Sequence, residues 1–192
     1  MDDDDNIWFT ICDEKNIMLE KNNNNDYKIT FNIHSKKGKD TDTVLNVLKN
    51  GQLFELLSAL NPDVIDKITV TEHDDVHDVF MSFKNSDQMD GEEVDKIINV
   101  YFSLQYNFKE HKCTITSQNN QNTHECHSDV KKKYGKESLH VSKIKLKVVE
   151  KNNKTSVCLI FKVDAKKSNN IINMYIGLYF KKIFYRFKQY FE

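Results

Sequence analysis

Five histidines and cysteines in one stretch are the best candidates in this sequence for metal chemistry. They are His111, Cys113, His124, Cys126 and His127. A zinc ion takes four nitrogen or sulfur ligands in tetrahedral geometry, so the set is large enough to bind one ion. However, neither HKC nor HECH has the C-x-x-C spacing that is typical of a zinc ribbon. The spacing favours polar loop residues over a metal site, and we predict no metal and no other cofactor.

Catalytic groups have equally little support. The segment HDDVHD (73–78) contains several acid–base groups, but its composition is typical of a solvated hairpin tip. None of the five glycines occurs in G-x-G-x-x-G or P-loop spacing, which argues against a phosphate-binding loop. No feature places a base beside a thiol, and no convergent acid–base set is evident. We therefore predict that the protein is not an enzyme.

The charge of the chain is divided unevenly between its halves. Residues 1–96 carry 10 Lys and Arg against 22 Asp and Glu, whereas residues 97–192 carry 18 against 7. A basic C-terminal half can approach the phosphates of lipid or nucleic acid, although the two halves can also neutralise each other within one fold. Lysine-rich segments are a weak signal for nucleic acid in a lysine-rich chain. We predict no nucleic-acid partner.

The ends and the cysteines of the chain indicate its compartment and its domain count. The N-terminus MDDDDNIW is acidic where a signal peptide would be basic. The four cysteines are scattered without a disulfide-rich pattern, which favours a reducing, cytoplasmic setting. A chain of 192 residues fits one domain. We expect residues 1–6 to form an acidic disordered tail and residues 7–192 to form a single domain.

Apolar and polar residues alternate in several segments, which predicts strands with one wet face. The clearest of these runs from Ile98 to Phe108, and Tyr27 to Ile33 is similar. A first strand or hairpin within 8–19 and strands at 67–71, 79–83, 113–117, 141–148 and 157–163 complete the expected set. Two short helices are expected after the first strands, at 43–48 and 52–60, where Asn50-Gly51 and Asn61-Pro62 end them.

The last stretch, 169–192, is predicted to be one long amphipathic helix of about 33 Å. It holds eight of the 21 aromatic residues of the protein, and apolar residues recur in it at steps of three and four. Such a broad apolar face needs an apolar partner. The strands supply one, since short polar turns between them imply an antiparallel sheet with one apolar face. We predict an α+β helix-grip fold: a curved antiparallel sheet wrapped around a long C-terminal helix.

Three stretches of the chain resemble the START domain, the steroidogenic-acute-regulatory-related lipid transfer family of the helix-grip superfamily. The segment from Trp8 to Ile33 is similar to its opening strands. LNPDVIDKITVTEHDDVHDVFMSFK (60–84) is similar to the stretch in which a Pro-Asp-Val-type turn enters a hairpin. KTSVCLIFKVDAKKSNNIINMYIGLYFKKIFYRFKQYFE (154–192) resembles the family's last strand and gate helix.

This resemblance implies a lipid-transfer protein that carries one lipid between sheet and C-terminal helix. The expected occupant is a phospholipid, which the protein exchanges between membranes as a monomer. Methionine and aromatic residues suit an adaptable cavity, although the same residues would also form a plain core. The expected cavity-lining residues come from the inward faces of the strands and the helix. They are Phe31, Met81, Phe83, Phe102, Leu104, Leu146, Phe161, Ile172, Ile176, Tyr179 and Ile183.

A set of basic residues near the C-terminus is expected to dock the protein peripherally on an anionic membrane, at about 1 kcal/mol per residue near the surface. This set is Lys166, Lys167, Lys181, Lys182, Arg186 and Lys188. A solvated helix face is the alternative reading of the same residues. The alternative for the whole chain is a protein-binding helix-grip domain, such as a chaperone co-activator, with a filled core.

Overall fold

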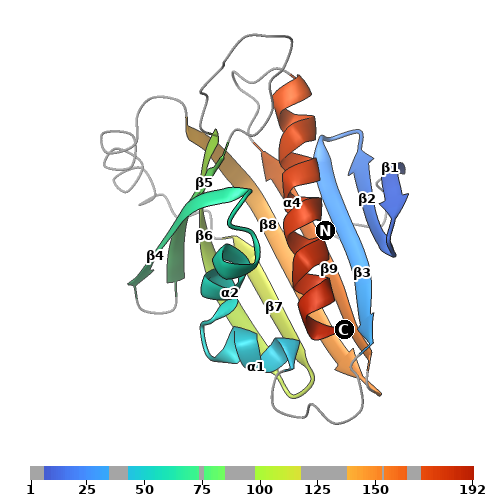
Figure 1. The fold of residues 1–192 in the computed structure, drawn as a ribbon, viewed down its shortest axis with the longest axis vertical. Coiled ribbons are helices and arrows are strands. Elements are labelled where there is room, and N and C mark those ends of the chain that lie inside the picture. The colour runs from blue at the N-terminus through green and yellow to red at the C-terminus, as the bar shows by residue number, and fades with distance from the viewer. Residues whose placement is uncertain are drawn as a thin grey trace.

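A computed structural model describes residues 7–34, 43–73, 76–84, 98–117, 138–152, 154–163 and 170–192. Within these ranges the side chains of 73, 98, 138–140, 163 and 170–175 are not described. The predicted acidic tail (1–6) and the loop containing His124, Cys126 and His127 lie outside the described residues. The predicted helix-grip fold is confirmed. Nine strands form one sheet, and α4 (Asn170–Phe191) lies across one of its faces (Figure 1).

The sheet has the strand order β1-β2-β3-β9-β8-β7-β6-β5-β4, and these neighbours are antiparallel. A short parallel pairing also joins β6 to β8. The strands are β1 (Trp8–Glu14), β2 (Ile17–Asn22), β3 (Asp26–His34), β4 (Ile65–His73), β5 (Val76–Phe83), β6 (Ile98–Lys109), β7 (Lys112–Ser117), β8 (Ser138–Lys151) and β9 (Lys154–Val163).

The two short helices are α1 (Val44–Lys49) and α2 (Leu53–Leu60), close to their predicted positions. The Thr43 side chain caps α1 by accepting a hydrogen bond from the backbone N–H of Asn46 at 3.2 Å. Gly51, with a φ of 70°, allows the chain to turn between the helices. In Figure 1, α1 and α2 lie over the β6–β7 end of the sheet, whereas α4 lies over β9 and β3 and also contacts β2.

The alternation of side chains divides the sheet into an inner face, which α4, α1 and α2 cover, and an outer face. On β3, Tyr27, Ile29 and Phe31 are buried on the inner face, whereas Lys28 and Thr30 point outward. The helix contributes buried residues to the same core, chiefly Ile176, Phe180, Ile183, Phe184 and Phe187. Burial of this shared apolar surface, at about 25 cal/mol per Å², is the main force that holds α4 on the sheet.

Candidate functional site

The predicted cavity residues lie on the inner face of the sheet and on the facing side of α4. All of these residues whose side chains are described are buried in the core cluster except Tyr179, which is half-buried against it. Ile172 belongs to α4, but its side chain lies outside the described part of the chain. The buried members are Phe31, Met81, Phe83, Phe102, Leu104, Leu146, Phe161, Ile176 and Ile183.

Aromatic rings connect the two sides of this interface. Phe161 of β9 and Phe180 of α4 have ring centroids 4.8 Å apart, and Phe180 meets Phe83 of β5 edge-on at 5.9 Å. Tyr179 stacks on Phe83 at 5.5 Å with an interplanar angle of 9°. A run of rings therefore crosses from β9 through α4 to β5. Such pairs contribute about 0.5–1.5 kcal/mol each beyond area burial.

One part of the predicted set lies under a different helix. Phe102 of β6 packs against Phe54 of α2, with ring centroids 6.4 Å apart. The inner face is therefore closed by three helices: α4 over β2, β3 and β9, α1 over β7 and β8, and α2 at the β4–β6 end. The sequence pattern predicted only the C-terminal helix as the cover of this face.

Tyr27 and Gly177 form a close contact that is not among the predicted site residues. Tyr27 begins the inner face of β3 and stacks on Phe161, with ring centroids 5.4 Å apart. A Cβ on Gly177 would lie 3.0 Å from two carbons of the Tyr27 ring, so the absence of a side chain at this position lets α4 approach β3. The available signal was Gly177 itself, which is the only weak helix former in the last helix.

The Tyr27 hydroxyl is a polar atom inside this apolar interface. The residue is 1% exposed, and its oxygen has no hydrogen-bond partner. Burial raises the pKa of the phenol above its ordinary value, so the hydroxyl stays protonated and can act as a donor.

The predicted membrane-docking residues of α4 are engaged in intramolecular contacts. Arg186 pairs with both carboxylate oxygens of Asp63, in the turn between α2 and β4, and Lys182 lies 3.1 Å from the same carboxylate. Hydrogen bonding from Arg186, followed by the Lys182 contact, holds the pKa of Asp63 well below its usual range. These pairs fasten the second half of α4 to the rim of the inner face.

The two remaining basic residues of α4 are also contacted within the chain. The amine of Lys181 lies 2.7 Å from the Cys12 sulfur and 3.7 Å from a Glu14 oxygen, both on β1. Lys188 is buried and pairs with Glu192 one turn along. Lys166 and Lys167 lie outside the described residues. Docking on an anionic membrane stays a prediction for the whole set.

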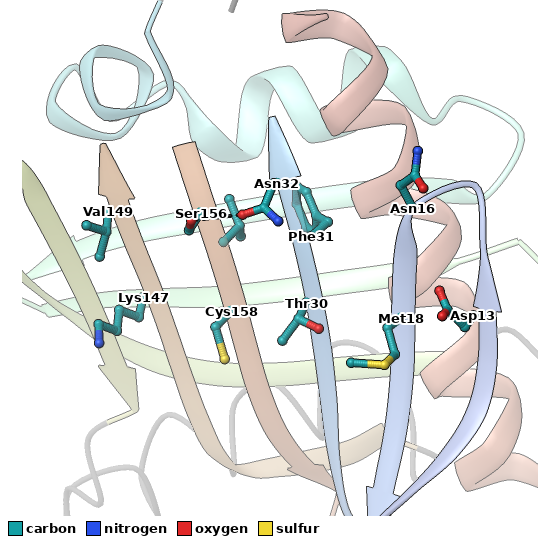
Figure 2. Close-up of a pocket in the computed structure, with 11 residues that line it drawn as sticks. Asp13, Asn16, Met18, Thr30, Phe31, Asn32, Lys147, Val149, Ser156 and Cys158 are labelled. Carbon is teal, nitrogen blue, oxygen red and sulfur yellow. Dashed lines mark hydrogen bonds between the residues drawn. The ribbon is translucent and has the colours of Figure 1, made fainter. Parts of the chain in front are cut away.

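Two grooves lie away from the interface between the sheet and α4. A groove of about 500 Å³ runs over the outer face, where Figure 2 shows polar side chains from β3, β8 and β9. Phe31, one of the predicted cavity residues, also borders it. A second groove of about 480 Å³ lies between α2 and strands β4 to β6, beside Tyr106, whose pKa is raised chiefly by burial.

The structure changes the interpretation of the histidine and cysteine stretch. Among the described residues, no group of three or more His, Cys, Asp or Glu side chains could hold a metal ion. His111 is exposed at the β6–β7 turn. Cys113 was predicted to begin a strand, which β7 confirms, but the expectation that it is a polar loop residue was wrong. It is fully buried in the core, and burial raises the pKa of its thiol to about 11.

No protein-family model and no curated protein sequence matches this chain. Solved structures do match. Human StAR-related lipid transfer protein 5 superimposes with a TM-score of 0.63 at 8% identity, covering 96% of this chain and 86% of that chain. The lipid transfer and protein localization domain of human StarD13 (DLC2) gives 0.62 at 13% identity, covering 97% and 89%.

The chain has the fold of a START domain. At these identities the likeness concerns the fold alone, which agrees with the architecture expected from the sequence. In the part of the chain that the structure describes, no helix is long and apolar enough to cross a membrane.

Proposed function

We propose that this START-like protein binds one lipid between the inner face of its sheet and helix α4, and exchanges that lipid between membranes. The observation that carries the proposal is a continuous apolar inner face that one long amphipathic helix, α4, covers along β2, β3 and β9, in a fold shared with lipid transfer proteins. A sixteen-carbon chain represents about 12 kcal/mol of transfer free energy. Only an apolar interior of this kind can replace the membrane for such a chain.

Binding requires α4 to move, because side chains from both sides meet across the interface. Phe180 contacts both Phe161 and Phe83, and a lipid chain between α4 and the sheet would replace such contacts. Aromatic–aromatic contacts exchanged for acyl–aromatic contacts keep the buried apolar area nearly constant. Replacing side-chain contacts by lipid contacts therefore changes the free energy little once α4 has moved away from the sheet.

The expected lipid is a phospholipid, and the expected trigger for release is an anionic membrane surface. Lys182 and Arg186 hold α4 to Asp63, whose side chain is half exposed. Lipid phosphates at the membrane would compete with this carboxylate for the same cations. In this proposal the protein is a cytoplasmic monomer that contacts membranes peripherally. Contact with the membrane breaks the ion pairs of Asp63 with Lys182 and Arg186, and α4 then moves away from the sheet.

Native mass spectrometry of the purified protein, combined with transfer of a fluorescent phospholipid between liposomes, tests the proposal. We expect a co-purified lipid and transfer above the rate in buffer. Ile176→Trp fills the interface from α4 and should reduce transfer at least tenfold, whereas Thr30→Trp adds the same side chain on the outer face and should not. A folded protein with no lipid and no transfer would contradict the proposal and favour a protein-binding helix-grip domain.

A further inference from the structure

The hydroxyl of Tyr27 is the one part of this side chain that packing does not explain. Its ring stacks on Phe161 and the residue is almost completely buried, but its oxygen has no partner. Buried polar groups in native proteins are nearly always hydrogen-bonded, because an unpaired one loses its interactions with water. A phenylalanine at this position would make the same ring contacts without that loss.

A second unfavourable feature occurs at the same point. Gly177 lies inside α4, where glycine destabilises a helix relative to alanine. Its lack of a side chain accommodates the Tyr27 ring, since a Cβ there would lie 3.0 Å from both Cδ1 and Cε1. The unpaired hydroxyl of Tyr27 on β3 and the glycine at position 177 on α4 thus each lower stability, and they lie at the same point although they are far apart in sequence. Locally unfavourable choices of this kind cluster at functional sites.

The surroundings of Tyr27 determine which ligand group would suit it. The hydroxyl can donate one hydrogen bond. Phe161, Leu19 and the backbone of Gly177 pack around the ring, and the amine of Lys21 lies 5.5 Å from the ring centroid. A phosphate buried among these apolar groups would lose its hydration, and one lysine would offset only part of that loss. An uncharged acceptor oxygen is far less costly, and an acyl lipid carries such an oxygen in each ester carbonyl, at the junction between its chains and its headgroup.

We propose that Tyr27 is a binding residue whose hydroxyl donates a hydrogen bond to an ester carbonyl of the bound acyl lipid. This inference rests on the lipid-binding function proposed above and names the chemical class of that lipid. Phe161 and Gly177 act as positioning residues for the ring. The hydrogen bond fixes how deep the lipid sits, because the carbonyl must reach the level of Gly177 on α4.

A comparison of ester and ether lipids tests this directly. Diacyl phosphatidylcholine and its dialkyl ether analogue differ in the two carbonyl oxygens and share the headgroup and chain length. Competition between the two lipids, read by native mass spectrometry, should show wild-type protein preferring the ester by about three- to tenfold. Tyr27→Phe should bind both equally. Tyr106→Phe makes the same chemical change in the groove beside α2 and should keep the wild-type preference.

The outcomes separate this inference from the function on which it rests. If both lipids bind but wild type does not discriminate, or if Tyr27→Phe keeps the preference, the carbonyl contact is wrong while lipid binding stands. If neither lipid binds to folded protein, the proposed function fails as well. Lipid-free Tyr27→Phe should unfold at the same temperature as wild type or higher, because it loses an unpaired buried hydroxyl. A clear fall would show that the hydroxyl has a partner within the protein.

Discussion

The two faces of the sheet differ in whether their polar side chains have hydrogen-bond or ion-pair partners. On the outer face, polar groups pair locally: Lys28 with Glu20 at 2.8 Å, and Ser156 with Asn32 at 2.9 Å. On the inner face, the contacts are between apolar groups and rings, and the hydroxyl of Tyr27 is left without a partner. These outer-face groups have partners within the protein. The inner face has an unused donor, which is why we assign the ligand to the inner face.

The largest predicted contrast between the faces comes from two substitutions on β9. Phe161→Ala removes a ring that contacts both Tyr27 and Phe180, and it should lower the free energy of unfolding by about 3–5 kcal/mol. Cys158→Ala, three residues earlier on the outer face, should lower it by less than about 1 kcal/mol. Urea denaturation measures both. Similar losses for the two variants would contradict the division into a packed inner face and a solvated outer one.

A smaller effect is expected where α4 approaches β3 most closely. Gly177→Ala gains about 1 kcal/mol of helix propensity, but the new methyl group meets the Tyr27 ring at 3.0 Å, and overpacking costs about 1–3 kcal/mol. We expect a net loss of about 1 kcal/mol in the same denaturation assay. Gln189→Ala, on an exposed position of α4, should change stability by less than about 0.5 kcal/mol. A stabilised Gly177→Ala would show that the helix does not need this close approach.

The fold was predictable because its signals are local and repeated. Alternation marked the strands, polar turns separated them, and the three-and-four spacing after residue 170 marked the amphipathic helix. The polar details of the site depend on contacts between distant segments, which periodicity does not report. Arg186 was predicted to face a membrane, but its partner Asp63 lies 123 residues earlier in the chain. Tyr27 was predicted as a strand residue, but its burial opposite Gly177, which leaves the hydroxyl without a partner, is visible only in the structure.

The smallest effect is expected at the rim, where ion pairs rather than apolar contacts hold α4. Asp63→Asn removes the carboxylate that Lys182 and Arg186 share, and because the groups are partly exposed we expect a loss of about 0.5–1 kcal/mol at neutral pH. The folded-state pKa of Asp63 lies below its unfolded value. The ion pairs therefore contribute fully above about pH 5, and this contribution is lost as the pH falls below about 4.

The difference in stability between wild type and Asp63→Asn should consequently shrink on acidification, whereas the exposed Asp66→Asn should show little difference from wild type at either pH.

The Asp63→Asn variant also tests whether the rim and the interior have different roles in function. If the rim pairs restrain opening, Asp63→Asn should release lipid to neutral liposomes a few-fold faster than wild type, while its ester-over-ether preference stays unchanged. An altered preference would mean that the rim also sets the lipid's position, and an unchanged release rate would remove the Asp63 pairs from the opening step.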